Sequence, residues 1–287
     1  MRELYRFCLL GLTFLLVFSV LYLLKNMKDV KDGYYKSTLP GYEIYNAIEK
    51  SKKRISKKKL VIGDSTGYQY YMHISDEDSI YSLACNQAIG MCGHFFLLDD
   101  FLKTGNRPEQ VYMVFYVSSF SNNLDQKFTY HYFLKPFCNK NYEERMSETV
   151  KRQIEKVPYH SLSQFPRILT SSWAPVYNPP SEFHLMSPIS NEYLLKIDSL
   201  QKAYGFELYL IPCLARKGIK EWNERLFQQH MNEVDPRLRE VVDRYFQGIH
   251  YMEDTCFSDG KHLKNPQLYR NMIEGEMRND SNKFRIH

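Results

Sequence analysis

From Leu60 onward, short apolar runs alternate with stretches that have the spacing of amphipathic helices. This alternation is typical of α/β folds, because a parallel sheet covered by helices on both faces needs strands that are apolar on both sides. We therefore predict a three-layer α/β/α sandwich of about five parallel strands. The expected strands lie at residues 59–63, 80–85, 110–117, 206–213 and 250–253.

A helix is expected over residues 191–204, between two of these strands. Its apolar residues recur at helical spacing, and Gly205 should end it, because glycine readily adopts the left-handed conformation of a helix C-cap. A shorter helix is expected to begin near Tyr42, ahead of the basic run at residues 51–59. Strand, helix and strand in this order predict right-handed crossovers between parallel strands.

The N-terminal segment, residues 7–24, is an uncharged apolar stretch of 18 residues. That length is at the short end of what crosses a bilayer as a helix. A cleaved signal peptide is the alternative, although residues 21–27 offer no small-x-small cleavage site. We therefore predict a tail at 1–6, a transmembrane anchor at 7–24, a linker and helix at 25–58, and one domain at 59–287.

The charges around the apolar segment leave its orientation open. Arg2 and Arg6 precede it and several lysines follow it, so a simple count of positive charges places the domain in the cytoplasm. Such a count has little force for a short tail ahead of a long domain. The net charge of +5 is concentrated in residues 51–59, beside the anchor, which favours lipid headgroups or solvent over nucleic acid as its partner.

Residues 126–190 interrupt the alternation and are rich in Tyr, Phe, Pro and Ser. They resemble an insertion over the sheet, which would either contact substrate or pack as core. Trp173 and Trp222 could stack on sugar rings, although large aromatic residues mostly serve packing. The six cysteines include no C-x-x-C pair and the histidines show no metal-ligand spacing, so we expect neither a metal nor a cofactor.

The candidate nucleophile is Ser65, which follows the strand at 59–63 within Gly63-Asp-Ser-Thr-Gly67. A sharp turn there would present the serine at the carboxyl end of a parallel strand, where open α/β sheets bind ligands. The start of a following helix would add amide dipoles that favour an oxyanion. Gly-Asp-Ser alone is a weak signal, since a polar turn with serine as a helix cap has the same residues.

Asp259 and His262 are three residues apart and follow the last expected strand. At this spacing the carboxylate can accept a hydrogen bond from one imidazole nitrogen and fix the tautomer. The other nitrogen is then free to take the proton of a serine. The occurrence of both segments in one α/β pattern is far more specific than either segment alone.

Together the two segments resemble the SGNH (GDSL-like) hydrolase superfamily over about residues 59–280. The resemblance implies that Ser65 is the nucleophile, His262 the base and Asp259 its orienting partner, and we accordingly expect the sandwich to be flavodoxin-like. The spacing Gly-x-Ser-x-Gly also fits the nucleophile elbow of α/β-hydrolases. That alternative is disfavoured because it needs several strands before the elbow and separates Asp from His.

In the SGNH superfamily a backbone amide from a second segment and an Asn side chain from a third complete the oxyanion hole. The second segment resembles residues 84–91, where the glycine falls one position early. The third resembles residues 117–123, which lack the Gly-x-Asn-Asp form. The resemblance predicts an oxyanion hole formed by Ser65, by Gly90 or Met91, and by Asn122 or Asn123.

The resemblance implies a membrane-anchored serine esterase or O-acetyltransferase, depending on whether water or a sugar hydroxyl is the second substrate. Membrane-tethered members often act on acetyl groups of envelope or surface polysaccharides. The expected substrate is therefore an acylated carbohydrate, and the domain is expected outside the cytoplasm, in the periplasm or at the cell surface. The irregular second and third segments motivate an alternative: a non-catalytic binding or assembly module of the same fold in polysaccharide biosynthesis or export.

Overall fold

The first element of the chain is a long apolar helix, α1 (Arg2–Asn26). The computed structural model describes residues 2–26, 41–74, 79–126, 128–158, 160–161 and 184–285. Over residues 2–23, helix α1 is long and apolar enough to cross a membrane, and its side chains are not buried against the rest of the protein. The apolar N-terminal helix is therefore present, while its retention and direction stay predictions.

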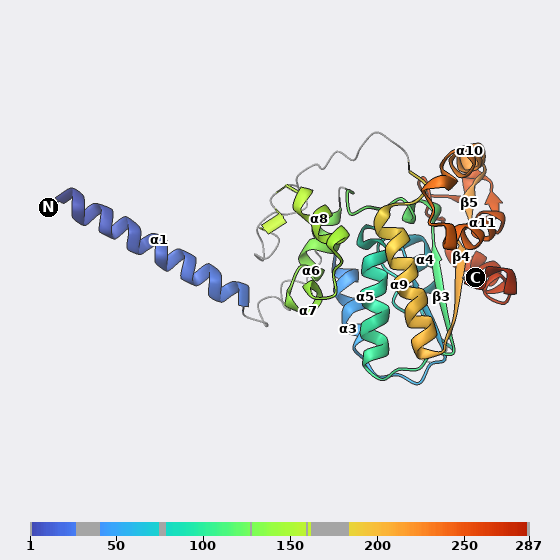
Figure 1. Ribbon diagram of the computed structural model, residues 1–287, viewed down its shortest axis with the longest axis horizontal. Coiled ribbons are helices and arrows are strands. Elements are labelled where there is room, and N and C mark those ends of the chain that lie inside the picture. The colour runs from blue at the N-terminus through green and yellow to red at the C-terminus, as the bar shows by residue number, and fades with distance from the viewer. Residues whose placement is uncertain are drawn as a thin grey trace.

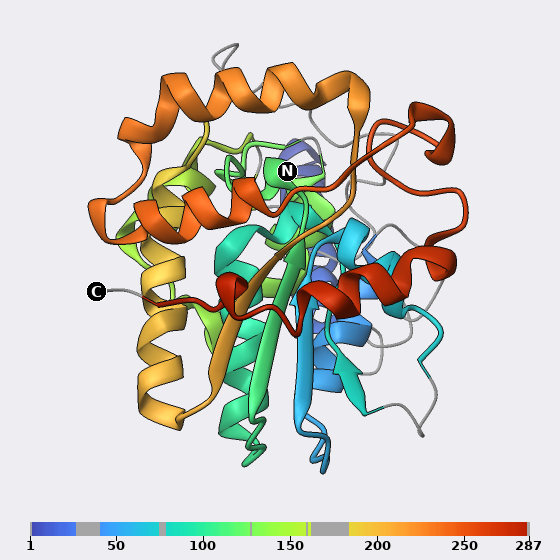
Figure 2. The same ribbon diagram turned by 90° about the vertical axis from the view of Figure 1, so that its right-hand side faces the viewer.

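The centre of the domain is a parallel sheet of four strands in the order β2-β1-β3-β4, seen side by side in Figure 2. Its strands are β1 (Lys59–Gly63), β2 (Ile80–Ser82), β3 (Gln110–Phe115) and β4 (Glu207–Pro212). Leu60, Val61 and Ile62 of β1 have no exposed surface, as expected for a strand covered on both faces. The α/β class and four of the expected strands are confirmed, with β2 shorter than predicted.

Helices cover the two faces of this sheet. On one face, α3 (Tyr42–Ser51), α5 (Gly90–Lys103) and α9 (Pro188–Tyr204) lie beside one another (Figure 1). On the other face lie α4 (Ser65–Tyr71) and α11 (Arg239–Gln247), with α12 (Arg270–Glu276) packed near α4. Helix α10 (Lys220–His230) follows the short strand β5 (Ala215–Arg216) in the chain. The sheet is therefore sandwiched between two helical layers.

Helix α9 extends the prediction for residues 191–204 by three residues at its start. The hydroxyl of Ser187 accepts the N–H of Ser190 at 3.0 Å and caps the helix one position before Pro188. Proline suits this first helical position because its missing N–H would have no partner there. Gly205, at φ 75°, ends the helix as predicted.

Part of the expected insertion at 126–190 is core. It contains the π-helical turn Tyr130–Leu134 and the short helices α6 (Lys135–Phe137), α7 (Lys140–Glu143) and α8 (Glu148–Lys156). Phe133 and Phe137 are fully buried, and the ring of Phe137 lies 5.6 Å from that of Phe96 in α5. Residues 162–183, which include Trp173, lie outside the described residues.

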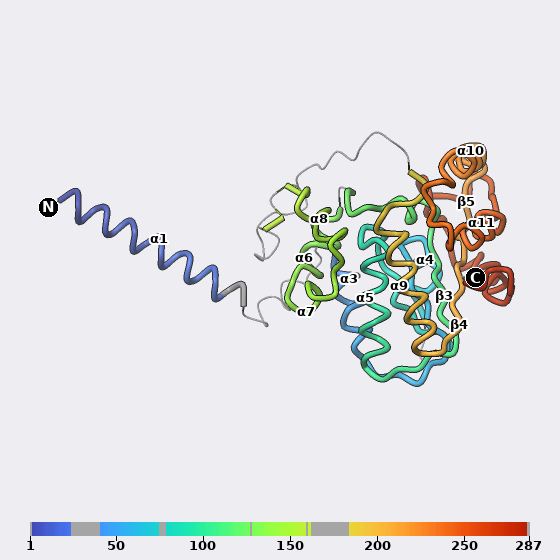
Figure 3. The backbone as a smooth tube through the Cα atoms, viewed as in Figure 1, coloured from blue at the N-terminus to red at the C-terminus, as the bar shows by residue number. Residues whose placement is uncertain are grey.

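The fifth expected strand, at residues 250–253, does not join the main sheet. It forms β6 (Tyr251–Met252), which pairs with β5 (Ala215–Arg216) in a separate two-stranded parallel sheet. β6 has only two residues, and both are half-buried. A central strand of a parallel sheet is instead a longer apolar run that is buried on both faces. The edge of β4 is instead covered by the end of the chain (Figure 3), where Phe284 donates its N–H to the carbonyl of Leu208 at 2.7 Å.

Candidate active site

Ser65 lies at the carboxyl end of β1, as the first residue of α4. The residue that caps this helix is Asp64, whose Oδ1 accepts the N–H groups of Thr66 at 2.9 Å and Gly67 at 3.2 Å. The hydroxyl of Ser65 is therefore not needed as a cap. The cap fixes the backbone at Ser65, and the serine itself is half-buried.

The second carboxylate oxygen of Asp64 connects β1 to β3. Asp64 Oδ2 accepts the N–H of Tyr116 at 2.8 Å and the hydroxyl of Ser119 at 2.6 Å, and the side chain is fully buried. Hydrogen bonds to an ionised carboxylate are short and strong. The turn that carries Ser65 is thereby fixed to the loop after β3. Nothing in the sequence around Asp64 distinguishes this connection from ordinary helix capping.

Two glycines allow α4 to begin close against β3. A Cβ atom on Gly63 would lie 1.8 Å from the carbonyl oxygen of Val114, and one on Gly67 would lie 2.1 Å from the same atom. Both distances are far inside van der Waals contact, so only glycine fits at either position. This close approach explains the Gly-x-x-x-Gly spacing around Ser65.

The loop that carries Asp259 and His262 is a tight turn closed by its own backbone. Ser258 donates its N–H to the carbonyl of His262 at 2.8 Å. Asp259 Oδ1 accepts the N–H groups of Lys261 and His262, each at 2.8 Å. The carboxylate of Asp259 therefore organises the turn as well as facing the imidazole.

Gln69 joins this loop to the helix that begins with Ser65. Its Oε1 atom accepts the N–H of Leu263 at 3.0 Å, and the Gln69 side chain is buried. Helix α4 thus presents Ser65 at its first position and holds the neighbour of His262 one turn later. The two segments predicted from the sequence meet through this contact.

A continuous hydrogen-bonded relay joins the three predicted catalytic residues. His262 Nδ1 lies 2.8 Å from Asp259 Oδ2, and His262 Nε2 lies 2.9 Å from the Oγ of Ser65. In the tautomer with the proton on Nδ1, the imidazole donates to Asp259 and can accept the serine proton on Nε2. The structure therefore brings Ser65, His262 and Asp259 together in the order that nucleophilic catalysis requires.

Asp259 is held in its ionised form. Partial burial by itself raises the pKa of this carboxyl, but the N–H groups of His262 and Lys261 and the imidazole of His262 outweigh that effect and lower the pKa to about 2. The Asp259 carboxylate therefore stays charged well below neutral pH. A fixed negative charge at this position favours a positive imidazole after proton transfer.

Two residues of the predicted oxyanion hole converge on one atom. The N–H of Gly90 and the Nδ2 of Asn122 both donate to the carbonyl oxygen of Gln87. Asn122 is buried, and its Oδ1 accepts the N–H of Leu124 at 2.9 Å, which fixes the orientation of the amide. Because an amide nitrogen carries two hydrogens, Asn122 keeps one for another acceptor, whereas Gly90 does not.

Of the two candidate asparagines, Asn122 is the one beside Gly90. A Cβ atom on Gly90 would lie 3.7 Å from Asn122 Nδ2. Asn123 has a buried Oδ1 with no hydrogen-bond partner among the described residues. Met91, the alternative source of the second amide, is buried in the first turn of α5.

Gln87 connects three loops at the site and was not singled out from the sequence. Its Oε1 accepts Lys261 Nζ at 2.6 Å and Ser118 Oγ at 3.2 Å, and its Nε2 donates to Gln126 Oε1 at 3.2 Å. Lys261 belongs to the loop that carries the predicted acid and base. No local motif marks these contacts, because they depend on how loops distant in sequence meet.

A groove of about 430 Å³ adjoins the relay. Trp222, at its wall, is half-buried and packs against the core as well as lining the groove. The volume lies within the usual range of small-molecule sites. The lining residues come from the loop after β3, from the region of α10 and from the Asp259 loop: Tyr116, Ser118, Ile219, Trp222, Asp259, Gly260 and Lys261.

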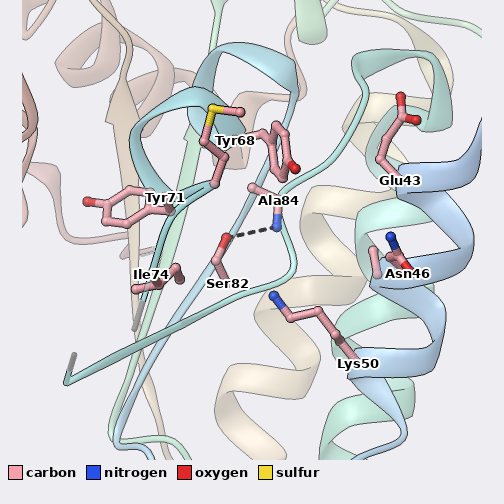
Figure 4. A pocket seen from close by; sticks show the side chains of 10 residues that line it. Glu43, Asn46, Lys50, Tyr68, Tyr71, Ile74, Ser82 and Ala84 are labelled. Atoms are coloured by element: carbon pink, nitrogen blue, oxygen red, sulfur yellow. Dashed lines mark hydrogen bonds between the residues drawn. The ribbon is translucent and has the colours of Figure 1, made fainter. Parts of the chain in front are cut away.

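A second cavity, of about 250 Å³, lies between α3, α4 and the outer strand β2 (Figure 4). Glu43 and Lys50 of α3 and Tyr68 of α4 line it, with Ser82 from β2. Burial raises the pKa of Glu43 and lowers that of Lys50. No residue of the Ser65 relay lines this cavity, so the groove at Trp222 is the better candidate for substrate.

Among the described residues, no three His, Cys, Asp or Glu side chains are grouped so that they could hold a metal ion. Comparisons of the chain with protein-family models, curated proteins and solved structures gave no match.

Proposed function

We propose that this chain is a serine-dependent acyl-transfer enzyme of the SGNH hydrolase type, with Ser65 as nucleophile, His262 as general base and Asp259 as the carboxylate that orients it. The observation that carries the proposal is the hydrogen-bonded relay from Asp259 through His262 to Ser65. Acyl transfer by serine requires such a base on the hydroxyl, with a third group behind it. A purely structural turn has no need of an imidazole there.

In the proposed reaction, Ser65 Oγ attacks an ester carbonyl while its proton moves to His262 Nε2. Asp259 stabilises the resulting imidazolium, and the Ser65 N–H and the second hydrogen of Asn122 Nδ2 donate to the oxyanion. His262 then protonates the leaving alkoxide, which departs and leaves an acyl-serine. Water or a sugar hydroxyl attacks that acyl group with His262 again as base, and Ser65 is regenerated.

The proposed substrate is an O-acetylated carbohydrate of the cell envelope or surface. The support is the groove beside the relay, where the half-buried Trp222 offers an aromatic surface against which a sugar ring can lie. Helix α1 supports a single-pass tether. The proposed placement of the domain outside the cytoplasm follows from the resemblance to membrane-tethered SGNH hydrolases. No nucleic acid and no cofactor are part of the proposal.

The proposed arrangement of the sandwich is flavodoxin-like. The strand order β2-β1-β3-β4, all parallel, corresponds to the first four strands of a flavodoxin-like sheet. Ser65 then follows β1, next to the point where the strand order reverses, and ligands bind at such points in open α/β sheets.

Hydrolysis by the full-length chain in detergent micelles tests the proposal. Wild-type protein should release 4-nitrophenol from 4-nitrophenyl acetate and acetate from an acetylated polysaccharide. Ser65→Ala should lower kcat by about a thousandfold or more. Ser121→Ala is a suitable control, because in the described part of the chain its hydroxyl bonds only the carbonyl of Ser118, at 2.9 Å. Turnover that survives in Ser65→Ala would contradict the proposal.

A non-catalytic binding module is the second candidate, and one observation favours it. The carbonyl of Gln87 already accepts the N–H of Gly90 and the amide of Asn122, so two predicted oxyanion donors are engaged. A wild-type chain that binds polysaccharide but neither turns over esters nor reacts with a phosphonate would support this candidate. Turnover that depends on Ser65 would exclude it.

A further inference from the structure

The groove beside the relay combines an aromatic wall with a cation. Tyr116 and Trp222 form the aromatic part, and Lys261 enters from the loop that carries the proposed acid and base. Ser118 also lines the groove and shares with Lys261 the acceptor Gln87 Oε1. Lys261 therefore lines the groove from the same loop as Asp259 and His262.

The charge of Lys261 is poorly compensated at short range. In the described part of the chain, its only hydrogen-bond acceptor is the neutral carboxamide of Gln87, at 2.6 Å. Burial lowers the pKa of Lys261, while the carboxylates of Asp64 and Asp259 act in the opposite direction from a longer range. Both carboxylates already accept several hydrogen bonds of their own. A half-buried ammonium in this position gains from an anionic partner.

The geometry of Lys261 leaves room for such a partner. An ammonium has three N–H donors, and Gln87 accepts one of them. The other two can bind a carboxylate or phosphate in the groove. An uncharged ester would leave the ammonium without a charged partner, so the residue discriminates between acidic and neutral ligands.

We infer that the groove binds an anionic sugar, with its carboxylate or phosphate on Lys261 and its ring against Trp222. If the groove binds the substrate of the proposed reaction, the acyl ester to be cleaved is carried by an acidic sugar unit. In this respect the inference rests on the proposed function. The binding itself does not require that Ser65 be reactive.

Binding of three sugars that carry no acyl group tests the inference. The probes are methyl glucuronide, glucose 6-phosphate and neutral methyl glucoside, titrated calorimetrically into the full-length chain in detergent micelles at fixed salt. At least one anionic sugar should bind about tenfold or more tightly than the neutral one. The stronger of the two anionic probes identifies carboxylate or phosphate as the preferred group.

Variants at Lys261 separate charge recognition from folding. Lys261→Met should abolish the preference for the anionic sugar, whereas Lys261→Arg, which keeps the charge, should retain most of it. Lys264→Met, at an exposed position in the same loop, should keep the full preference. Equal binding of anionic and neutral sugars by the wild-type chain, absence of binding by all three, or a preference that survives in Lys261→Met would overturn the inference.

The same design distinguishes this inference from the proposed function. A chain that turns over 4-nitrophenyl acetate through Ser65 but shows no preference for an anionic sugar would refute the inference alone. A chain that binds the anionic sugar through Lys261 but never turns over an ester would refute the proposed function and keep the binding site.

Discussion

His262 Nε2 lies 2.9 Å from the hydroxyl of Ser65, although 197 positions separate the two residues. Each side of this contact is fixed separately. Asp64 caps the helix that begins with Ser65, and Asp259 organises the turn that carries His262. The contact therefore follows from two rigid pieces of the fold that meet, rather than from the conformation of one side chain.

Asp259→Asn should lower kcat by roughly a thousandfold to ten-thousandfold, because an amide N–H facing Nδ1 would favour the wrong imidazole tautomer. Initial rates with 4-nitrophenyl acetate measure this. Asp243→Asn is the control, since among the described residues that carboxylate bonds only the side chain of Gln247, at 2.9 Å. Similar rates for Asp259→Asn and wild type would mean that the carboxylate does not orient the base.

Asn122→Ala should lower kcat by about a hundredfold or more, the usual effect of removing one oxyanion donor. Asn123→Ala should stay within about tenfold of wild type, because Asn122 is the asparagine whose amide lies next to Gly90. The comparison is made on folded protein, checked by circular dichroism. The reverse ranking of the two variants would move the oxyanion donor to Asn123.

Gly67→Ala should destabilise the domain by about 3 kcal/mol, the upper end for overpacking a tight site, because its Cβ would lie 2.1 Å from the Val114 carbonyl. Urea unfolding measures this change. Gly275→Ala is the matched control, since a Cβ there meets no atom within 4 Å in helix α12. Equal stability of the two variants would show that the approach of α4 to β3 is not tight.

Acid should destabilise the fold through His94, which is fully buried in α5. Burial lowers its pKa from 6.5 to about 4, despite the opposing effect of Asp64. The unfolded chain therefore binds the proton more tightly. Keeping His94 neutral in the folded protein contributes to the free energy of unfolding, and this contribution is fully present above about pH 6.5. It is lost as the pH falls towards 4, so the free energy of unfolding should fall by about 2 kcal/mol between pH 7.5 and 5.

His94→Leu removes this titration. Between pH 7.5 and 5, the free energy of unfolding should fall in both proteins, but the fall should be about 2 kcal/mol smaller in the variant than in wild type. Urea unfolding at each pH measures both changes. Because both ring nitrogens of His94 lack hydrogen-bond partners among the described residues, leucine leaves no described group unpaired. An unchanged pH dependence would assign the acid sensitivity to other groups.

The sheet and each half of the relay could be predicted because local sequence determines them separately. An apolar run ends at Gly63, and the close approach to Val114 demands glycine there and at Gly67. The separation of Asp259 and His262 by three residues is enough to form their hydrogen bond within one turn. The contacts of the two glycines follow from the pairing of β1 with β3, and the contact of Asp259 with His262 lies within one turn of the chain.

The loops around the site could not be predicted in the same way. Of residues 250–253, only Tyr251 and Met252 form a strand, and they pair with β5, while Phe284 near the end of the chain bonds to β4. The choice between Asn122 and Asn123 depends on a loop in which Leu124 has φ 58°, a conformation that leucine rarely adopts. Gln87 and Lys261 touch across 174 positions of sequence, with no motif at either end.

Mass spectrometry of the full-length chain after reaction with a fluorophosphonate tests the central claim most directly. We expect a single adduct, on Ser65, which is absent from Ser65→Ala and forms at least about a hundredfold more slowly in His262→Ala. An adduct on a different residue, or an unmodified wild-type chain in a sample where a known serine esterase reacts, would contradict the account.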